Sequence, residues 1–149
     1  MYQEPLSPIV RIATTVDATH LAHLYEHIEA RSLSTSHMLA RLQAAQALET
    51  IFLAEVGEQV VALACLRLAP TLTSETPHAE ITELYVPGGS PEQQIEQLLL
   101  EQCEILARQR GAQSIALLAG LKNENAQGLY HRLGYRDYAL AMRKLLGVA

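Results

Sequence analysis

The chain has 149 residues, of which 49% are hydrophobic and 18% charged, and this composition excludes a disordered chain. Its length suits a single domain, 1–149, with one apolar core. The formal net charge of −5 argues against a nucleic-acid-binding module, because such a module needs a basic surface. The sequence shows neither a signal-peptide pattern nor an apolar run of membrane-spanning length. We therefore expect a soluble cytoplasmic protein with no membrane partner.

The first half of the chain predicts a strand, two helices and a β-hairpin. Asp17 or Thr15 can cap the first helix, which carries an apolar stripe at helical spacing. Gly57-Glu58 separates two runs rich in Ile, Val and Leu and predicts a tight turn between them. The expected elements are a strand over 9–13, a helix from about 17, a second helix over 36–48, and strands over 51–56 and 59–68.

The second half predicts a loop followed by alternating strands and helices. Residues 69–77 are polar and hold two prolines, so they are expected to form the longest loop. The expected elements after it are a strand over 79–86, a helix over 91–110, a strand over 114–118, a helix over 123–133 and a last strand over 138–145. The order β-α-α-β-β-β-α-β-α-β predicts an α/β fold in which one mixed sheet has helices on both faces.

The helix over 91–110 carries signals at both ends. Arg108 and Arg110 near its end complement the helix dipole, and Gly111 can terminate it. Ser90-Pro91-Glu92-Gln93 fits a capping box, with the serine at the N-cap and the proline at the first helical position. This start is expected to satisfy its own backbone N–H groups instead of leaving them for an anion.

Neither the cysteines nor the histidines predict a metal site. Cys65 lies in a strand pattern and Cys103 on an apolar helix face, so both are expected to be buried thiols in a reducing compartment. His20, His23 and His27 lie on one side of the first helix, but the segment does not read H-E-x-x-H.

The segment NENAQGLYHRLGY, residues 123–135, is similar to the pattern N-x-x-A-x-x-L-Y-x-x-L-G-F/Y of the GNAT superfamily of N-acetyltransferases. The order of elements resembles that superfamily over nearly the whole chain. The resemblance implies a mainly antiparallel sheet with a V-shaped opening between strands 79–86 and 114–118. It also implies acetyl-CoA as co-substrate, Tyr130 as the acid that protonates the departing thiolate, and Asn123 as a cofactor contact. A purely structural interpretation, in which this helix supplies core residues and Gly134 ends it, is compatible with the catalytic one.

The strand AEITELYV carries the second part of the resemblance. In the family, the main chain matching Leu84, Tyr85 and Val86 pairs with the pantetheine amides. Glu80 matches a general base of the histone-acetyltransferase branch, and a carboxylate suits that role because the amine must lose a proton before it attacks. Glu83 is expected on the opposite face, since strand side chains alternate. The alternative for either glutamate is a solvated charge at the sheet edge.

The connection between that strand and its helix departs from the family pattern R/Q-x-x-G-x-G/A. Its first position falls on Pro91, which lacks an N–H, and its glycines fall on Gln94 and Glu96. Glu92 and Glu96 also bring negative charge toward a pyrophosphate, at roughly 1 kcal/mol for each close pair. The residues that would hold this end of the cofactor are Gln93, Gln94, Ile95 and Glu96.

Two functions follow from these observations. The first is acetyl transfer from acetyl-CoA to a small-molecule or peptide amine. The alternative is a GNAT-fold regulatory or interaction module that no longer binds CoA tightly. The acceptor and the oligomeric state, including a homodimer, stay open at this point.

Overall fold

The computed structural model describes residues 6–88 and 92–147. The chain divides into two compact units, Met1–Leu117 and Leu118–Ala149. The first unit contains β1 (Ile9–Ile12), a short 3-10 helix (Thr15–Asp17), α1 (Ala18–Glu29), α2 (Thr35–Gln46), β2 (Glu49–Val56), β3 (Gln59–Thr71), β4 (Ser74–Tyr85), α3 (Glu92–Gln109) and β5 (Ala116–Leu117). The second contains α4 (Glu124–Arg132). In the described residues, no helix is both long enough and apolar enough to cross a membrane.

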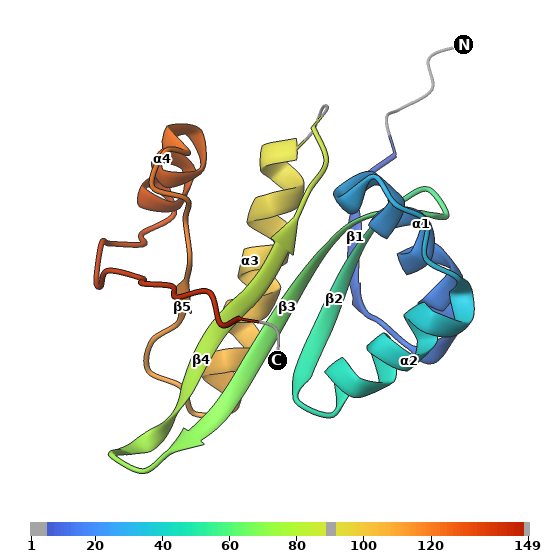
Figure 1. Ribbon diagram of the computed structural model, residues 1–149. Helices are drawn as coiled ribbons and strands as arrows, with labels where there is room; N and C mark the ends of the chain where they lie inside the picture. Colours follow the sequence, from blue (N-terminus) through green and yellow to red (C-terminus); the bar gives the residue numbers. More distant parts are fainter. Residues whose placement is uncertain (1–5, 89–91, 148–149) are drawn as a thin grey trace. The chain divides into compact units, whose positions relative to one another are not determined.

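The sheet of the first unit has the strand order β1-β2-β3-β4-β5 within the described ranges (Figure 1). Neighbouring strands are antiparallel, except that β5 runs parallel to β4. Gly57, with a φ of +65°, lies in the turn between β2 and β3, where Val56 pairs with Gln59. The predicted mixed, mainly antiparallel α/β fold and the predicted hairpin are therefore confirmed.

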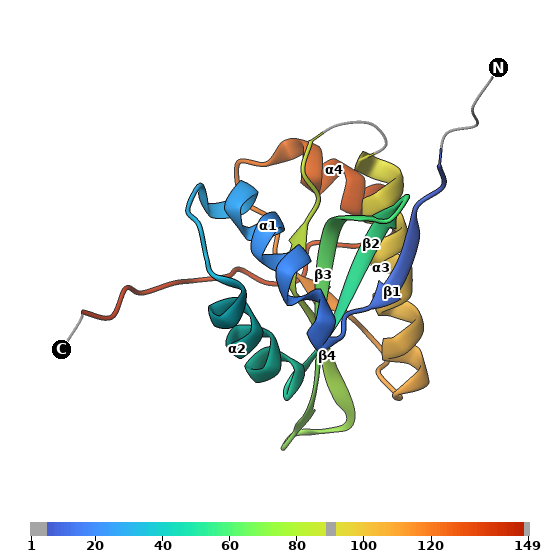
Figure 2. The same cartoon turned by 90° about the vertical axis from the view of Figure 1, so that its right-hand side faces the viewer.

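Helices cover both faces of the sheet in the first unit (Figure 2). On one face, α1 and α2 pack on buried side chains of β2 and β3, including Ile51, Leu53, Leu63 and Cys65. On the other face lies α3, whose buried residues are Ile95, Leu99, Leu100, Cys103 and Ala107. The three-to-four spacing of these residues matches the apolar stripe predicted from the sequence. Gly111, with a φ of +88°, follows α3 as the expected terminating glycine.

An ion-pair network joins the start of α1 to the sheet. The Asp17 side chain is only 1% exposed, and its Oδ1 lies 2.6 Å from Nη2 of Arg11. The same carboxylate accepts the Thr14 N–H, so Asp17 does not cap α1 with its side chain as expected. Arg11 also contacts Glu55 of β2, at 2.8 Å. At the end of α2, Gln46 Nε2 donates to the carbonyl oxygen at position 13, at 3.1 Å.

The loop predicted over 69–77 is wrong, because β3 and β4 continue through it as a long hairpin. Thr71 pairs with Ser74, so only two residues remain in the turn. The register shifts between Ala69 and Thr71, and this shift leaves Pro70 outside the ladder. A proline within a strand is tolerated at such an irregularity because no hydrogen bond is required of it there.

A β-bulge in β4 decides which side chains face α1 and α2. Cys65 pairs with Glu83, but the next residue of β3, Leu66, pairs with Ile81, which leaves Thr82 as an extra residue. A bulge of this kind interrupts the alternation of side chains along the strand. Residues on the two sides of Thr82 therefore cannot be assigned to faces by counting in twos.

The strand predicted over 114–118 is shorter than expected. Two pairs join β5 to β4, Glu80 with Ala116 and Ile81 with Leu117. From Thr82 to Tyr85, β4 continues beyond the last residue of β5. Within the first unit, β4 and β5 therefore stop pairing after Ile81 and Leu117, and the last four residues of β4 have no partner in β5, as the predicted opening requires.

The second unit is organised around α4. The Asn123 side chain caps this helix by accepting the Ala126 N–H at 3.1 Å, and Gly134, with a φ of +98°, follows its end. The strand predicted over 138–145 is wrong, since residues 135–147 form neither strand nor helix. The alternating apolar side chains that suggested it, Tyr138, Leu140 and Met142, are between 69% and 93% exposed. A strand needs a hydrogen-bonding neighbour, and none is paired with this segment in the described residues.

Candidate active site

A cavity of about 560 Å³ lies between the helix pair α1–α2 and the strands β3 and β4. Its volume falls in the range of small-molecule sites in proteins. Most of its lining is apolar and belongs to the core cluster beneath the helices. The apolar residues are Leu21, Ile28, Met38, Leu42, Ala45, Ile51, Leu63 and Leu84.

Glu83 presents a carboxylate to this cavity from β4. Its position follows from the bulge, because Glu83 pairs with Cys65, whose side chain belongs to the core under α1 and α2. The Sγ of Cys65 donates a weak hydrogen bond to Oε2 of Glu83 at 3.5 Å. Burial raises the pKa of the Cys65 thiol, and the Glu83 carboxylate raises it further, so the thiol stays protonated. Cys65 therefore serves as a neutral donor that orients Glu83.

Glu80, predicted as the general base, does not line the cavity in the described residues. It pairs with Arg67, two residues after Cys65 along regular β3, and so lies on the same face as Glu83. The expectation that the two glutamates point to opposite faces is therefore wrong, and the extra residue Thr82 is the physical reason. The carboxylate of Glu80 lies 3.6 Å from the His78 ring nitrogen Nε2.

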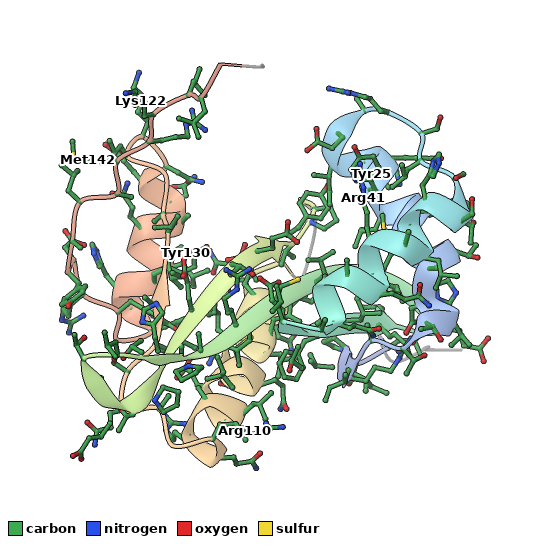
Figure 3. All side chains as sticks on the ribbon, turned by 60° about the horizontal axis from the view of Figure 1, so that its bottom comes forward. Tyr25, Arg41, Arg110, Lys122, Tyr130 and Met142 are labelled. Atoms are coloured by element: carbon green, nitrogen blue, oxygen red, sulfur yellow. The ribbon has the colours of Figure 1, made fainter. Side chains whose placement is uncertain are left out.

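A cation and an aromatic ring meet at the helix side of the cavity. The guanidinium carbon of Arg41, on α2, lies 5.2 Å from the ring centroid of Tyr25, on α1. Figure 3 shows the two side chains side by side. A cation at this distance from an aromatic ring is attracted by the ring electrons. Sequence reasoning missed Glu83 as the cavity-facing carboxylate and missed this pair altogether.

The predicted cofactor residues of β4 lie at its free edge. Leu84 and Tyr85 pair with β3 on one side, and in the first unit β5 supplies no partner for them on the other. Their backbone groups on that side can therefore take an extended amide chain as an added strand would. Both side chains also line the cavity. Val86 follows directly after β4. The residues present thus fit the amide portion of a CoA thioester.

The start of α3 fits a pyrophosphate less well. Gln93 and Gln94 are exposed, Ile95 is 5% exposed and faces the core, and Glu96 is half-buried. None of the four is glycine, so side chains stand where phosphate would need the backbone. Ser90 and Pro91, on which the predicted capping box depends, lie outside the described residues.

Asn123 and Tyr130, the remaining predicted site residues, belong to the second unit. Asn123 is engaged as the N-cap of α4. Tyr130 is half-buried, and its ring makes an edge-to-face contact with that of Tyr135, with centroids 6.2 Å apart.

Comparison with known proteins shows the family of this chain. A model of the acetyltransferase (GNAT) family matches residues 13–135, which include parts of both units. The chain belongs to the GNAT acetyltransferase family. Comparison with curated protein sequences finds no significant match.

Solved GNAT acetyltransferases share the fold at low sequence identity. An Agrobacterium tumefaciens protein assigned as an acetyltransferase has a TM-score of 0.83 and 22% identity, over 93% of this chain and 99% of that one. The ribosomal-protein-alanine N-acetyltransferase of Brucella melitensis has a TM-score of 0.79 and 15% identity, over 95% and 100%. An aminoglycoside N-acetyltransferase solved in complex with CoA has a TM-score of 0.78 and 12% identity, over 97% and 99%. GNAT acetyltransferases generally use acetyl-CoA, and the last of these relatives is CoA-bound.

Proposed function

We propose that this chain transfers an acetyl group from acetyl-CoA to a primary amine held in the cavity. The observation that carries the proposal is the position of Glu83, an exposed carboxylate that lines a cavity of small-molecule size in a GNAT-family chain, next to the free edge of β4. A primary amine is protonated at neutral pH, so a neighbouring carboxylate both attracts it and accepts its proton.

The reaction is a direct displacement at the thioester. The neutral amine attacks the acetyl carbonyl carbon, a C–N bond forms and the C–S bond breaks. The proton lost by the nitrogen goes to a carboxylate, directly or through water. Glu83 is our first choice for this base because it lines the cavity, and Glu80 is the second because it lies on the same face. Tyr130, assigned by the family pattern, would return a proton to the leaving thiolate.

We also propose that the chain binds the pyrophosphate end of acetyl-CoA weakly. The side chains at Gln94 and Glu96 oppose a dianion, whereas the backbone of Leu84 and Tyr85 suits the pantetheine arm. We therefore propose that binding energy from the thioester end outweighs that from the phosphate end. The single domain expected from the sequence stays part of the proposal, because the family match includes parts of both units.

The test is a titration of acetyl-CoA into the purified chain by calorimetry, followed by incubation with a mixture of primary amines. We expect heat of binding and the appearance of N-acetylated product by mass spectrometry, with CoA thiol released in equal amount. A chain that neither binds acetyl-CoA nor releases thiol with any amine would contradict the proposal and favour the regulatory module.

A further inference from the structure

We infer that the acceptor of this cavity is a primary amine with an apolar body and a carboxylate, and that Arg41 recognises the carboxylate. The inference rests on the proposed function and specifies its substrate class. It depends on three features of the first unit: the apolar lining, the carboxylate of Glu83, and the guanidinium of Arg41 over the Tyr25 ring.

The apolar lining of the cavity favours a ligand whose main part is also apolar. Eight aliphatic or methionine side chains surround the cavity, whereas the charged ones are Glu29, Arg41 and Glu83. The remaining polar side chains, Tyr25, Thr82 and Tyr85, offer few hydrogen bonds beside this wall. A ligand rich in hydroxyl groups would therefore leave several of them against aliphatic carbon, and each buried unpaired group costs about 1–3 kcal/mol. This argues against an aminoglycoside acceptor, although aminoglycoside N-acetyltransferases share the fold.

Arg41 indicates that the ligand carries a carboxylate as its second polar group. It is the one cation among the described residues that line the cavity, and no carboxylate of residues 6–88 and 92–147 lies within ion-pair distance of it. Its guanidinium carbon lies 5.2 Å from the centroid of the Tyr25 ring, and the N–H donors of this exposed side chain can meet a ligand. A carboxylate matches these donors with two parallel hydrogen bonds.

The two recognition points have opposite charge, and this selects one class of acceptor. Glu83 attracts an ammonium group, and Arg41 repels one. A zwitterionic apolar amino acid offers an amine to Glu83, a carboxylate to Arg41 and an apolar side chain to the aliphatic wall. A polyamine would gain from Glu29 and Glu83 but would be opposed by Arg41, so it is the closest competing class.

The experiment compares acceptors that differ only in the carboxylate. Leucine is set against 3-methylbutylamine and phenylalanine against 2-phenylethylamine, with spermidine and kanamycin as the other classes. Binding is measured by calorimetry without acetyl-CoA, and turnover by thiol release with it. We expect each amino acid to bind about 10- to 100-fold more tightly than its decarboxylated partner, as a charge-assisted bidentate contact allows.

Variants of Arg41 make the test specific. Arg41→Gln should remove the preference by weakening the binding of the amino acid without weakening that of 3-methylbutylamine, and Arg41→Lys should retain only part of the preference. Arg108→Gln, at an exposed position of α3 on the other face of the sheet, is the matched control and should retain the full preference. The thermal midpoint of each variant confirms that it is folded.

The outcomes separate the inference from the proposed function. Equal affinity of the paired acceptors, an Arg41→Gln variant that weakens both alike, or tighter binding of spermidine or kanamycin would overturn the inference. Amino acids that bind through Arg41 but release no thiol in the presence of acetyl-CoA would support the ligand class and contradict the proposed acetyl transfer.

Discussion

The Sγ of Cys65 lies 3.5 Å from Oε2 of Glu83 across the paired strands β3 and β4. The contact joins a buried neutral thiol to a carboxylate at the cavity. Because burial and the carboxylate raise the pKa of the thiol, the proton stays on sulfur and the carboxylate stays the acceptor.

Exchange of Glu83 for its amide tests the base directly. Glu83→Gln should lower turnover by about 10²–10⁴-fold, because the amide cannot accept the amine proton. Glu80→Gln is the matched control on the same face of β4, and it should have a small effect if Glu83 is the base. Steady-state rates across a pH series decide between them. A larger loss in Glu80→Gln would restore the role that the family resemblance gave to Glu80.

Removal of one hydroxyl tests the proton donor. Tyr130→Phe should lower turnover by about 10²–10⁴-fold while leaving acetyl-CoA affinity nearly unchanged, because only the acid is lost. Tyr135→Phe serves as control, since its ring makes the edge-to-face contact with Tyr130 and the substitution keeps that ring. Turnover and calorimetric affinity are measured for both variants. Unchanged turnover in Tyr130→Phe would remove this residue from the mechanism.

Restoring the family pattern at the start of α3 tests the pyrophosphate argument. The combined change Pro91→Arg, Glu92→Gly, Gln94→Gly and Glu96→Gly should tighten acetyl-CoA binding roughly tenfold or more, since it adds a cation and removes two negative charges. Gln97→Gly, at an exposed position further along the helix, controls for the loss of helix propensity. Micromolar binding by the unaltered chain, with no gain in the variant, would show that this start accepts phosphate as it is.

The buried carboxylate of Asp17 predicts a loss of stability in acid. Arg11 holds the pKa of Asp17 well below its usual range, so the folded chain keeps this group ionised at a pH where the unfolded chain protonates it. Its contribution is complete above about pH 5 and falls as the pH drops below the ordinary carboxyl pKa near 4. Asp17→Asn should lower the unfolding free energy by on the order of 3 kcal/mol at pH 7 and by less at pH 3.

Denaturant unfolding at pH 7, 5 and 3 measures this dependence. Asp137→Asn is the control, because the Asp137 side chain is 93% exposed and its contact with His131 lies at the surface. A difference between the unaltered chain and Asp17→Asn that does not shrink in acid would contradict the assignment.

Both cysteines should be inert in the folded chain. Cys65 is 4% exposed and Cys103 is fully buried, and burial raises the pKa of Cys103 to about 12. Little thiolate forms at neutral pH, and thiolate is the reactive species. A thiol reagent should therefore detect no cysteine thiol in the folded protein and two per chain after unfolding. Prompt labelling of the folded protein would contradict the burial, whereas its absence lets CoA release be followed without background.

Much of the fold could be predicted from the sequence because the signals were local. Gly57, Gly111 and Gly134 mark a turn and two helix ends, and each has the positive φ that the pattern required. The apolar stripe of α3 likewise fixed its buried face. These features depend on neighbours within a few residues, which a sequence shows directly.

The candidate site was harder to predict because it depends on pairing between strands. A single extra residue, Thr82, reverses the alternation and brings Glu83 to the face of Glu80. The strand predicted over 138–145 was wrong because the alternation of apolar residues shows only that a strand could form. A strand also needs a partner, which the alternation does not reveal. The pair of Tyr25 and Arg41 comes from two helices and leaves no periodic signal in either.

The polar contacts that tie α1 and α2 to the sheet gather at one end of the helix pair. Asp17 begins α1 and binds Arg11, and Gln46 ends α2 and donates to a carbonyl of the same region. The opposite end is the connection 30–34, which starts at Ala30 in a left-handed conformation, φ +52°, that costs alanine roughly 1–2 kcal/mol.

Tyr25 lies in the half of α1 nearer to that connection, and Arg41 lies close to the middle of α2. The wall that carries them is therefore held in place at the end where Asp17 and Gln46 lie. A change that breaks the Asp17 ion pair is expected to alter acceptor binding as well as stability, because the same two helices line the cavity.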